Sequence, residues 1–137
     1  MNLVEQLLKA DAKKADELAT DVFKSNRLAR ILGLEDAVDV SIQEIPSRRM
    51  NELAGYTYDR KGNFQFEKSY DANLMACTEG IAEPNLRDKD LQRHFGTNNA
   101  SQLCEKLFGS EVSEIADAIA ALSGYAGEEN KEEAIKN

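Results

Sequence analysis

The apolar residues at the start of the chain recur at helical spacing. One stripe is formed by Leu3, Val4, Leu7 and Leu8. Asn2 precedes the stripe and Glu5 follows three residues later, which is the pattern of a capping box. The sequence therefore predicts a short N-terminal helix. The next stretch, residues 11–21, is polar and alanine-rich, and we expect a solvated connection or the frayed end of that helix.

Helical spacing dominates the chain after Ser69. Residues 74–82 carry one apolar face, and Pro84 is expected to end that helix because the residue before a proline is driven out of the α region. Three further helices are predicted over residues 88–95, 100–108 and 112–122. Asp88 and Asn99 have the positions of N-terminal caps. Their expected core residues are Leu91, Phe95, Leu103, Leu107 and Phe108.

Strands are predicted between residues 21 and 45. Val38, Val40 and Ile42 alternate with polar residues, which is typical of a strand with one buried face. Residues 21–32 are ambiguous, because their early residues favour a strand and their later ones have helical spacing. We expect a strand there, paired with residues 38–45 through a turn near Gly33.

Residues 46–66 are predicted to form a short helix and then a turn. Pro46 stops the strand, and the helix is expected to end at Gly55, where a positive φ is easily accommodated. Aromatic residues alternate on both sides of Asp59–Gly62. The pattern fits a small hairpin, and equally a flexible loop whose aromatic residues cover the core.

These elements predict an α+β fold. An N-terminal helix and a small antiparallel β element are followed by a C-terminal bundle of short amphipathic helices. With 137 residues, one domain is the default. We expect a single domain over residues 1–124 and a charged, flexible tail over residues 125–137.

Charge and composition narrow the function. Hydrophobic residues make up 42% of the chain and charged residues 31%, which is a globular composition. The net charge of −8 repels a phosphate backbone, so nucleic-acid binding is disfavoured. No apolar run approaches a membrane span or a signal sequence, and we expect no membrane partner. Cys77 and Cys104 stand among apolar helical neighbours, as reduced thiols in a cytoplasm would.

Candidate chemistry is sparse. His94, the only histidine, is predicted to lie in the last turn of a helix, where a structural role outweighs catalysis or metal binding. Glu79 and Glu83 would share a helical face, which is common on solvated surfaces. Two cysteines without C-x-x-C spacing do not suggest zinc, and no glycine-rich phosphate loop is present. Residues 59–63 read as a turn and not as a calcium loop. We therefore expect no catalytic residue, cofactor or metal; an enzyme would need a pocket that brings His94 close to Glu83 or Asp90.

Several short motifs resemble the XkdN-like family of phage tail assembly chaperones. They are residues 79–86 (EGIAEPNL), residues 88–91 (DKDL) leading to Phe95-Gly96, and residues 122–125 (LSGY). The final residues 133–137 (EAIKN) are similar to the acidic ending of the family. The predicted N-terminal helix and the strand before Pro46 fit the same layout.

This resemblance implies a protein of a phage or prophage tail operon, acting in the bacterial host cytoplasm. It would bind and solubilise the tape measure protein and help to recruit the tail tube protein, and self-association is left open. We expect partner contacts on the tail and on apolar residues that the helices leave exposed. The tail candidates are Tyr125, Glu128, Glu129, Glu132, Glu133 and Ile135. Two alternatives remain: a structural tail or neck component, and a small acidic regulatory interaction protein.

Overall fold

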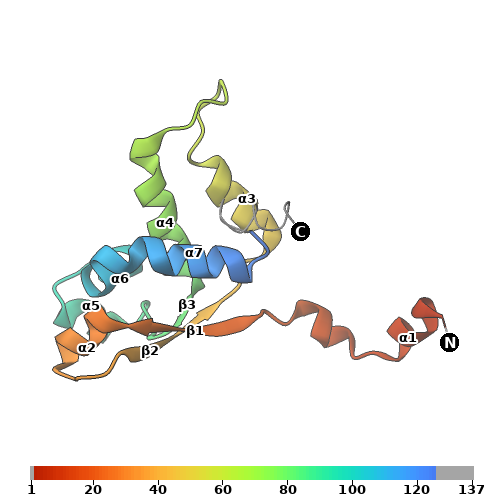
Figure 1. The fold of residues 1–137 in the computed structure, drawn as a ribbon, viewed down its shortest axis with the longest axis horizontal. Coiled ribbons are helices and arrows are strands. Elements are labelled where there is room, and N and C mark those ends of the chain that lie inside the picture. Colours follow the sequence, from red (N-terminus) through yellow and green to blue (C-terminus); the bar gives the residue numbers. More distant parts are fainter. Residues whose placement is uncertain (1, 126–137) are drawn as a thin grey trace.

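The computed structural model of the protein describes residues 2–125 (Figure 1). The chain forms an α+β fold, as the sequence predicts. Its N-terminal half contains α1 (Leu3–Lys9), the 3₁₀ turn η1 (Ala12–Asp16), β1 (Thr20–Ser25), α2 (Asn26–Leu32), β2 (Val38–Gln43) and α3 (Ser47–Gly55). The second half contains α4 (Phe66–Gly80), β3 (Ile81–Glu83), α5 (Lys89–His94), α6 (Ala100–Phe108), η2 (Gly109–Glu111) and α7 (Val112–Leu122).

A three-stranded antiparallel sheet has β2 at its centre, between β1 and β3. Val40 and Ile42 of β2 are fully buried, which confirms the alternating pattern of this strand. They pack with the inner faces of α4, α6 and α7 in one hydrophobic core. Phe108, Leu103, Ile115 and Ile119 are its largest helical members.

The expected strand over residues 21–32 is only half correct. Residues 20–25 do pair with β2, but the chain then turns into α2. Ser25 caps this helix, because its Oγ accepts a hydrogen bond from the Leu28 amide at 3.0 Å. Ser25 also donates to Glu111 at 2.6 Å, and Glu111 accepts from the Asn26 amide at 3.1 Å. The Glu111 carboxylate thus lies at the N-terminus of α2, the positive end of the helix dipole, and its hydrogen bonds hold α2 against η2.

The helix predicted before Pro84 ends earlier than expected. α4 stops at Gly80, and Ile81–Glu83 form β3, whose Ile81 pairs with Ile42. Three residues are too few to show a strand period in the sequence. The prediction that Gly55 adopts a positive φ is also wrong, since Gly55 lies within α3 and is not among the glycines with positive φ in residues 2–125.

The predicted caps and most predicted core residues are confirmed. Asn2, Asp88 and Asn99 accept hydrogen bonds from the amides of Glu5, Leu91 and Gln102 at 2.9 Å each. Leu103, Leu107 and Phe108 are buried. Leu91 and Phe95 are half-buried instead, because they lie at the margin of the core.

Gly80 lets α4 and α7 approach closely. A Cβ atom at this position would lie 2.6 Å from Cδ1 and 2.8 Å from Cγ2 of Ile119, a side chain that is itself fully buried. Atoms do not approach so closely without displacement, so only glycine fits here without repacking.

We predict that Gly80→Ala lowers the free energy of unfolding by about 1–3 kcal/mol, because the added methyl group overpacks the core. Gly55→Ala is the matched control, since a Cβ there meets nothing within 4 Å. It should raise stability by about 0.5 kcal/mol through helix propensity. Urea unfolding of both variants measures the difference. Equal effects of the two substitutions would contradict the close contact.

Candidate functional site: an exposed aromatic tip

α3, the loop after it and the first half of α4 form an arm that projects from the body of the molecule (Figure 1). The sequence places five of the nine aromatic residues of the chain between positions 56 and 70. All five are exposed in the structure: Tyr56, Tyr58, Phe64, Phe66 and Tyr70. We call Tyr58, Phe64 and Phe66 the aromatic tip. Phe66 is the most exposed of the three, at 80%.

A tight turn presents the tip. Tyr58 and Phe64 form an isolated antiparallel bridge, and their rings meet edge to face at 5.7 Å between centroids. Between them the Asp59 carboxylate accepts from the amides of Lys61 and Asn63, at 2.8 and 2.9 Å. The hydrogen bond from the Asn63 amide is the largest of the effects that lower the pKa of Asp59. The structure therefore contains the turn of the expected hairpin, with pairing limited to one bridge.

Beside the tip lies a groove between α3, α4 and α7, with a volume of about 250 Å³. Phe64 belongs to the aromatic tip and also lines the groove. Most of the remaining lining is small or apolar: Met50, Leu53, Ala54, Ala72, Ala76, Ala116 and Ala120. Alanine side chains leave room for a larger apolar side chain from outside.

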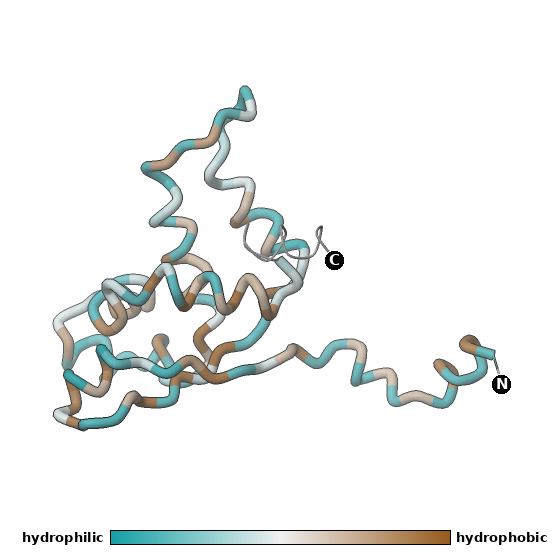
Figure 2. The backbone as a smooth tube through the Cα atoms, in the orientation of Figure 1, coloured by the Kyte–Doolittle hydropathy of each residue, from teal (hydrophilic) through white to brown (hydrophobic). Residues whose placement is uncertain are grey.

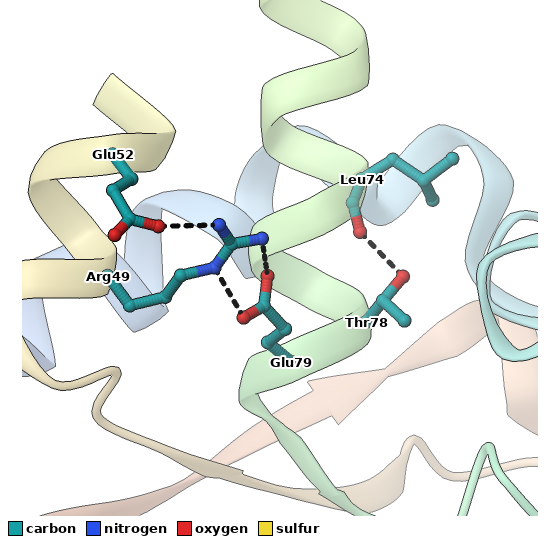
Figure 3. Close-up of polar contacts among 5 residues, drawn as sticks. All are labelled: Arg49, Glu52, Leu74, Thr78 and Glu79. Atoms are coloured by element: carbon teal, nitrogen blue, oxygen red, sulfur yellow. Dashed lines mark hydrogen bonds and ion pairs between the residues drawn. The ribbon is translucent and has the colours of Figure 1, made fainter. Parts of the chain in front are cut away.

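Charged contacts hold α3 against α4 at the base of the arm (Figure 3). The Arg49 guanidinium donates to both carboxylate oxygens of Glu79, at 2.8 and 2.9 Å, and to Glu52 at 2.9 Å. These charge-assisted hydrogen bonds raise the pKa of Arg49, and they are stronger than bonds between neutral groups. On the opposite side of α4 in this view, Thr78 donates to the Leu74 carbonyl at 2.7 Å.

Glu79 therefore does not share a helical face with Glu83. α4 ends between them, so Glu83 belongs to β3 and Glu79 is engaged with Arg49. The sequence interpretation of a solvated glutamate pair was wrong in its geometry.

Tyr70 joins the arm to α6. Its hydroxyl donates to the Glu105 carboxylate at 2.8 Å. Partial burial, and then this hydrogen bond, raise the pKa of Tyr70 to about 12. The neutral phenol is therefore the form that the folded state prefers.

His94 lies in the last turn of α5, as predicted, with its ring edge to face against Phe95 at 5.0 Å. It lines an open pocket of about 510 Å³ together with Glu83, Asp88 and Asp90. Within residues 2–125, no hydrogen bond or ion pair joins His94 to these carboxylates, and Asp90 pairs with Arg93 instead.

The two cysteines are buried neighbours on α4 and α6, and both are free thiols. The Cys77 thiol also donates to the Val112 carbonyl at 3.2 Å. The hydrogen bond with Cys104 and burial raise the pKa of Cys77, so it stays a thiol and behaves as a core residue. The part of the chain that the structure describes contains no group of ligands that could hold a metal ion. It also contains no helix long and apolar enough to cross a membrane.

Of the predicted partner-binding residues, only Tyr125 is described. Its amide donates to the Ala120 carbonyl at 2.7 Å and closes the end of α7, while its side chain is exposed. Glu128, Glu129, Glu132, Glu133 and Ile135 lie outside the described residues. The aromatic tip was not predicted as a binding surface. The alternating aromatic residues around the turn were the feature of the sequence that could have indicated it.

A small α+β domain with this exposed aromatic surface has the features of a protein-binding domain. The sequence matches the family of phage XkdN-like tail assembly chaperone proteins over residues 4–136. The chain therefore belongs to this family of tail assembly chaperones, which confirms the resemblance in its sequence motifs.

A solved structure shares the fold. The crystal structure of the protein YqbN, a target of the Northeast Structural Genomics Consortium, matches with a TM-score of 0.52 and 13% sequence identity. The match covers 80% of this chain and 89% of that chain. Among curated proteins, no sequence matches this chain significantly.

We predict that Tyr70 ionises near pH 12, against about 10 for an unperturbed tyrosine. Tyr70→Phe should remove this late step from an ultraviolet titration of tyrosinate, and Glu105→Gln should move it to lower pH. Because the folded pKa is raised, the contribution of Tyr70 to stability is complete below about pH 10 and is lost as pH rises through 12. Loss of a step near pH 10 instead of pH 12 in the Tyr70→Phe variant would refute the contact with Glu105.

Proposed function

We propose that this chaperone binds the tape measure protein in the cytoplasm of the bacterial host, keeps it soluble, and helps to recruit tail tube subunits. The observation that carries the proposal is the aromatic tip beside an apolar groove. Exposed aromatic side chains that are fixed by a turn can bury large apolar areas at low cost in conformational entropy. A protein without a partner for this surface would risk aggregation through it.

The expected ligand is an amphipathic helix of the tape measure protein. A long helical chain with apolar stripes needs cover until the tail tube surrounds it. The groove between α3, α4 and α7 suits one large apolar side chain of such a helix, and the tip would cover its neighbours. The net charge of −8 on the chaperone would keep the loaded complexes apart.

We predict that a tip variant, Tyr58→Ser/Phe64→Ser/Phe66→Ser, folds but no longer solubilises the tape measure protein. The three side chains are exposed, so their loss removes little core packing. Truncation of one side chain that dominates an interface typically lowers the binding affinity by about tenfold or more. The measurement is the soluble yield of co-expressed tape measure protein, followed by co-purification.

Leu18→Ser/Leu34→Ser is the matched control, because both leucines are exposed and lie outside the tip and the groove. It should preserve the soluble yield. Equal yields with the tip variant and the unaltered chaperone would reject the tip as the binding surface. Recovery of the chaperone in purified particles would favour a structural tail component instead.

The C-terminal tail is a second proposed contact, through Glu128, Glu129, Glu132, Glu133 and Ile135. Deletion of residues 126–137 keeps Tyr125 and its contact with α7. The buried hydrophobic residues that the structure describes lie between Leu28 and Ile119, and the deletion retains all of them, so we expect an unchanged thermal unfolding midpoint. Binding of the tape measure protein should weaken, as measured by titration calorimetry. Unchanged affinity would remove the tail from the binding surface.

A further inference from the structure

The N-terminal helix α1 has an apolar face that no other described part of the chain covers. Leu3, Val4, Leu7 and Leu8 are between 64% and 81% exposed, and α1 has no buried residue. The helix stands apart from the body at the end of an extended segment (Figure 1), and its apolar positions are visible there in Figure 2. A seven-residue helix is marginal alone in water, so α1 needs a surface to pack against.

The body of the protein offers such a surface at its opposite end. A groove of about 160 Å³ lies between α2 and α5, over Leu107 of α6. Its walls are formed by Ile31, Leu32, Pro84, Leu91 and Phe95. Ile31 and Leu32 are exposed, at 42% and 60%, although they continue the apolar face of α2. The groove therefore fits apolar side chains from a short helix.

The charges around the groove favour a basic helix end. The acidic pocket described above shares Pro84 and Leu91 with the groove and adds Glu83 and Asp88 to its rim. Lys9 ends α1, and Lys13 and Lys14 follow in η1 between Asp11 and Asp16. An apolar stripe followed by lysines matches an apolar groove beside carboxylates.

The path of the chain directs α1 away from the groove of its own molecule. Ala19 is fixed beside Glu44, because its amide donates to the Glu44 carboxylate at 2.7 Å and its carbonyl accepts from the Glu44 amide at 2.8 Å. β1 then runs for six residues, about 20 Å, before α2 begins. α2 and its groove lie at one end of β1, whereas the segment before Ala19, with α1, extends beyond the other end (Figure 1).

We propose that two copies of the protein exchange α1, so that the helix of each copy packs into the groove between α2 and α5 of the other. Reciprocal exchange forms a closed two-fold dimer with two identical helix-in-groove contacts. This dimer uses neither the aromatic tip nor the groove beside it, so it leaves the proposed binding surface for the tape measure protein free.

The test is the mass of the full chain in solution, measured by light scattering after size-exclusion chromatography. The chain mass is 15.2 kDa, and the proposal predicts twice that value. The α1 variant, Leu7→Asp/Leu8→Asp, should be monomeric at the same concentration and equally stable, because neither leucine packs in the fold. The groove variant, Ile31→Glu/Leu32→Glu, should also be monomeric.

Mixing the two variants distinguishes exchange from other forms of pairing. The α1 variant retains its groove and the groove variant retains its α1, so the mixture should recover a dimer with one intact contact. The tip variant is the control and should remain dimeric. Three results would overturn the proposal: a monomeric unaltered chain, a dimeric α1 variant, or a mixture of folded variants that stays monomeric. Loss of dimers in the α1 variant and loss of tape measure binding in the tip variant are separate readouts.

Discussion

The close contact between Gly80 and Ile119 is the constraint on which the other features of this fold depend. It brings the C-terminal end of α4 directly against α7, and the chain passes at once from Gly80 into β3. β3 then pairs with β2, so one glycine position connects the helical layer to the sheet. Because this end of α4 is fixed in the core, the other end projects outward and carries the aromatic residues with it.

Polar contacts then fix the parts of the molecule that the core leaves free. Arg49 and Glu79 hold α3 beside α4, and Tyr70 with Glu105 holds α4 beside α6. At the far end, Glu111 binds the start of α2, and Arg27 of α2 donates to the Leu107 carbonyl of α6 at 3.1 Å. These contacts position two apolar surfaces, at the arm and at α2, on a protein whose net charge is otherwise strongly negative.

The sequence predicted those elements whose signal is local. Caps such as Asn99, the helical period of residues 100–122 and the alternation in residues 38–42 are each decided by neighbours in the chain. β3 could not be predicted, because its three residues are a strand only through pairing with β2. The strand predicted through residue 32 failed because Ser25 caps a new helix, and the partner of this buried serine, Glu111, is distant in sequence. Burial was the least predictable property: Leu7 and Leu103 belong to similar stripes, yet one is exposed and the other is in the core. The candidate site was missed for the same reason, since aromatic residues that cover a core and aromatic residues that await a partner look alike in sequence.

We propose that this chaperone receives the tape measure protein on its arm. Hydrogen–deuterium exchange of the chaperone, alone and bound to the tape measure protein, tests it most directly because exchange locates the contact without altering the chain. Slower exchange over residues 56–70 and along the facing sides of α3 and α4 is the predicted result. A stable complex in which exchange on the arm is unchanged, and slows only elsewhere, would contradict the account.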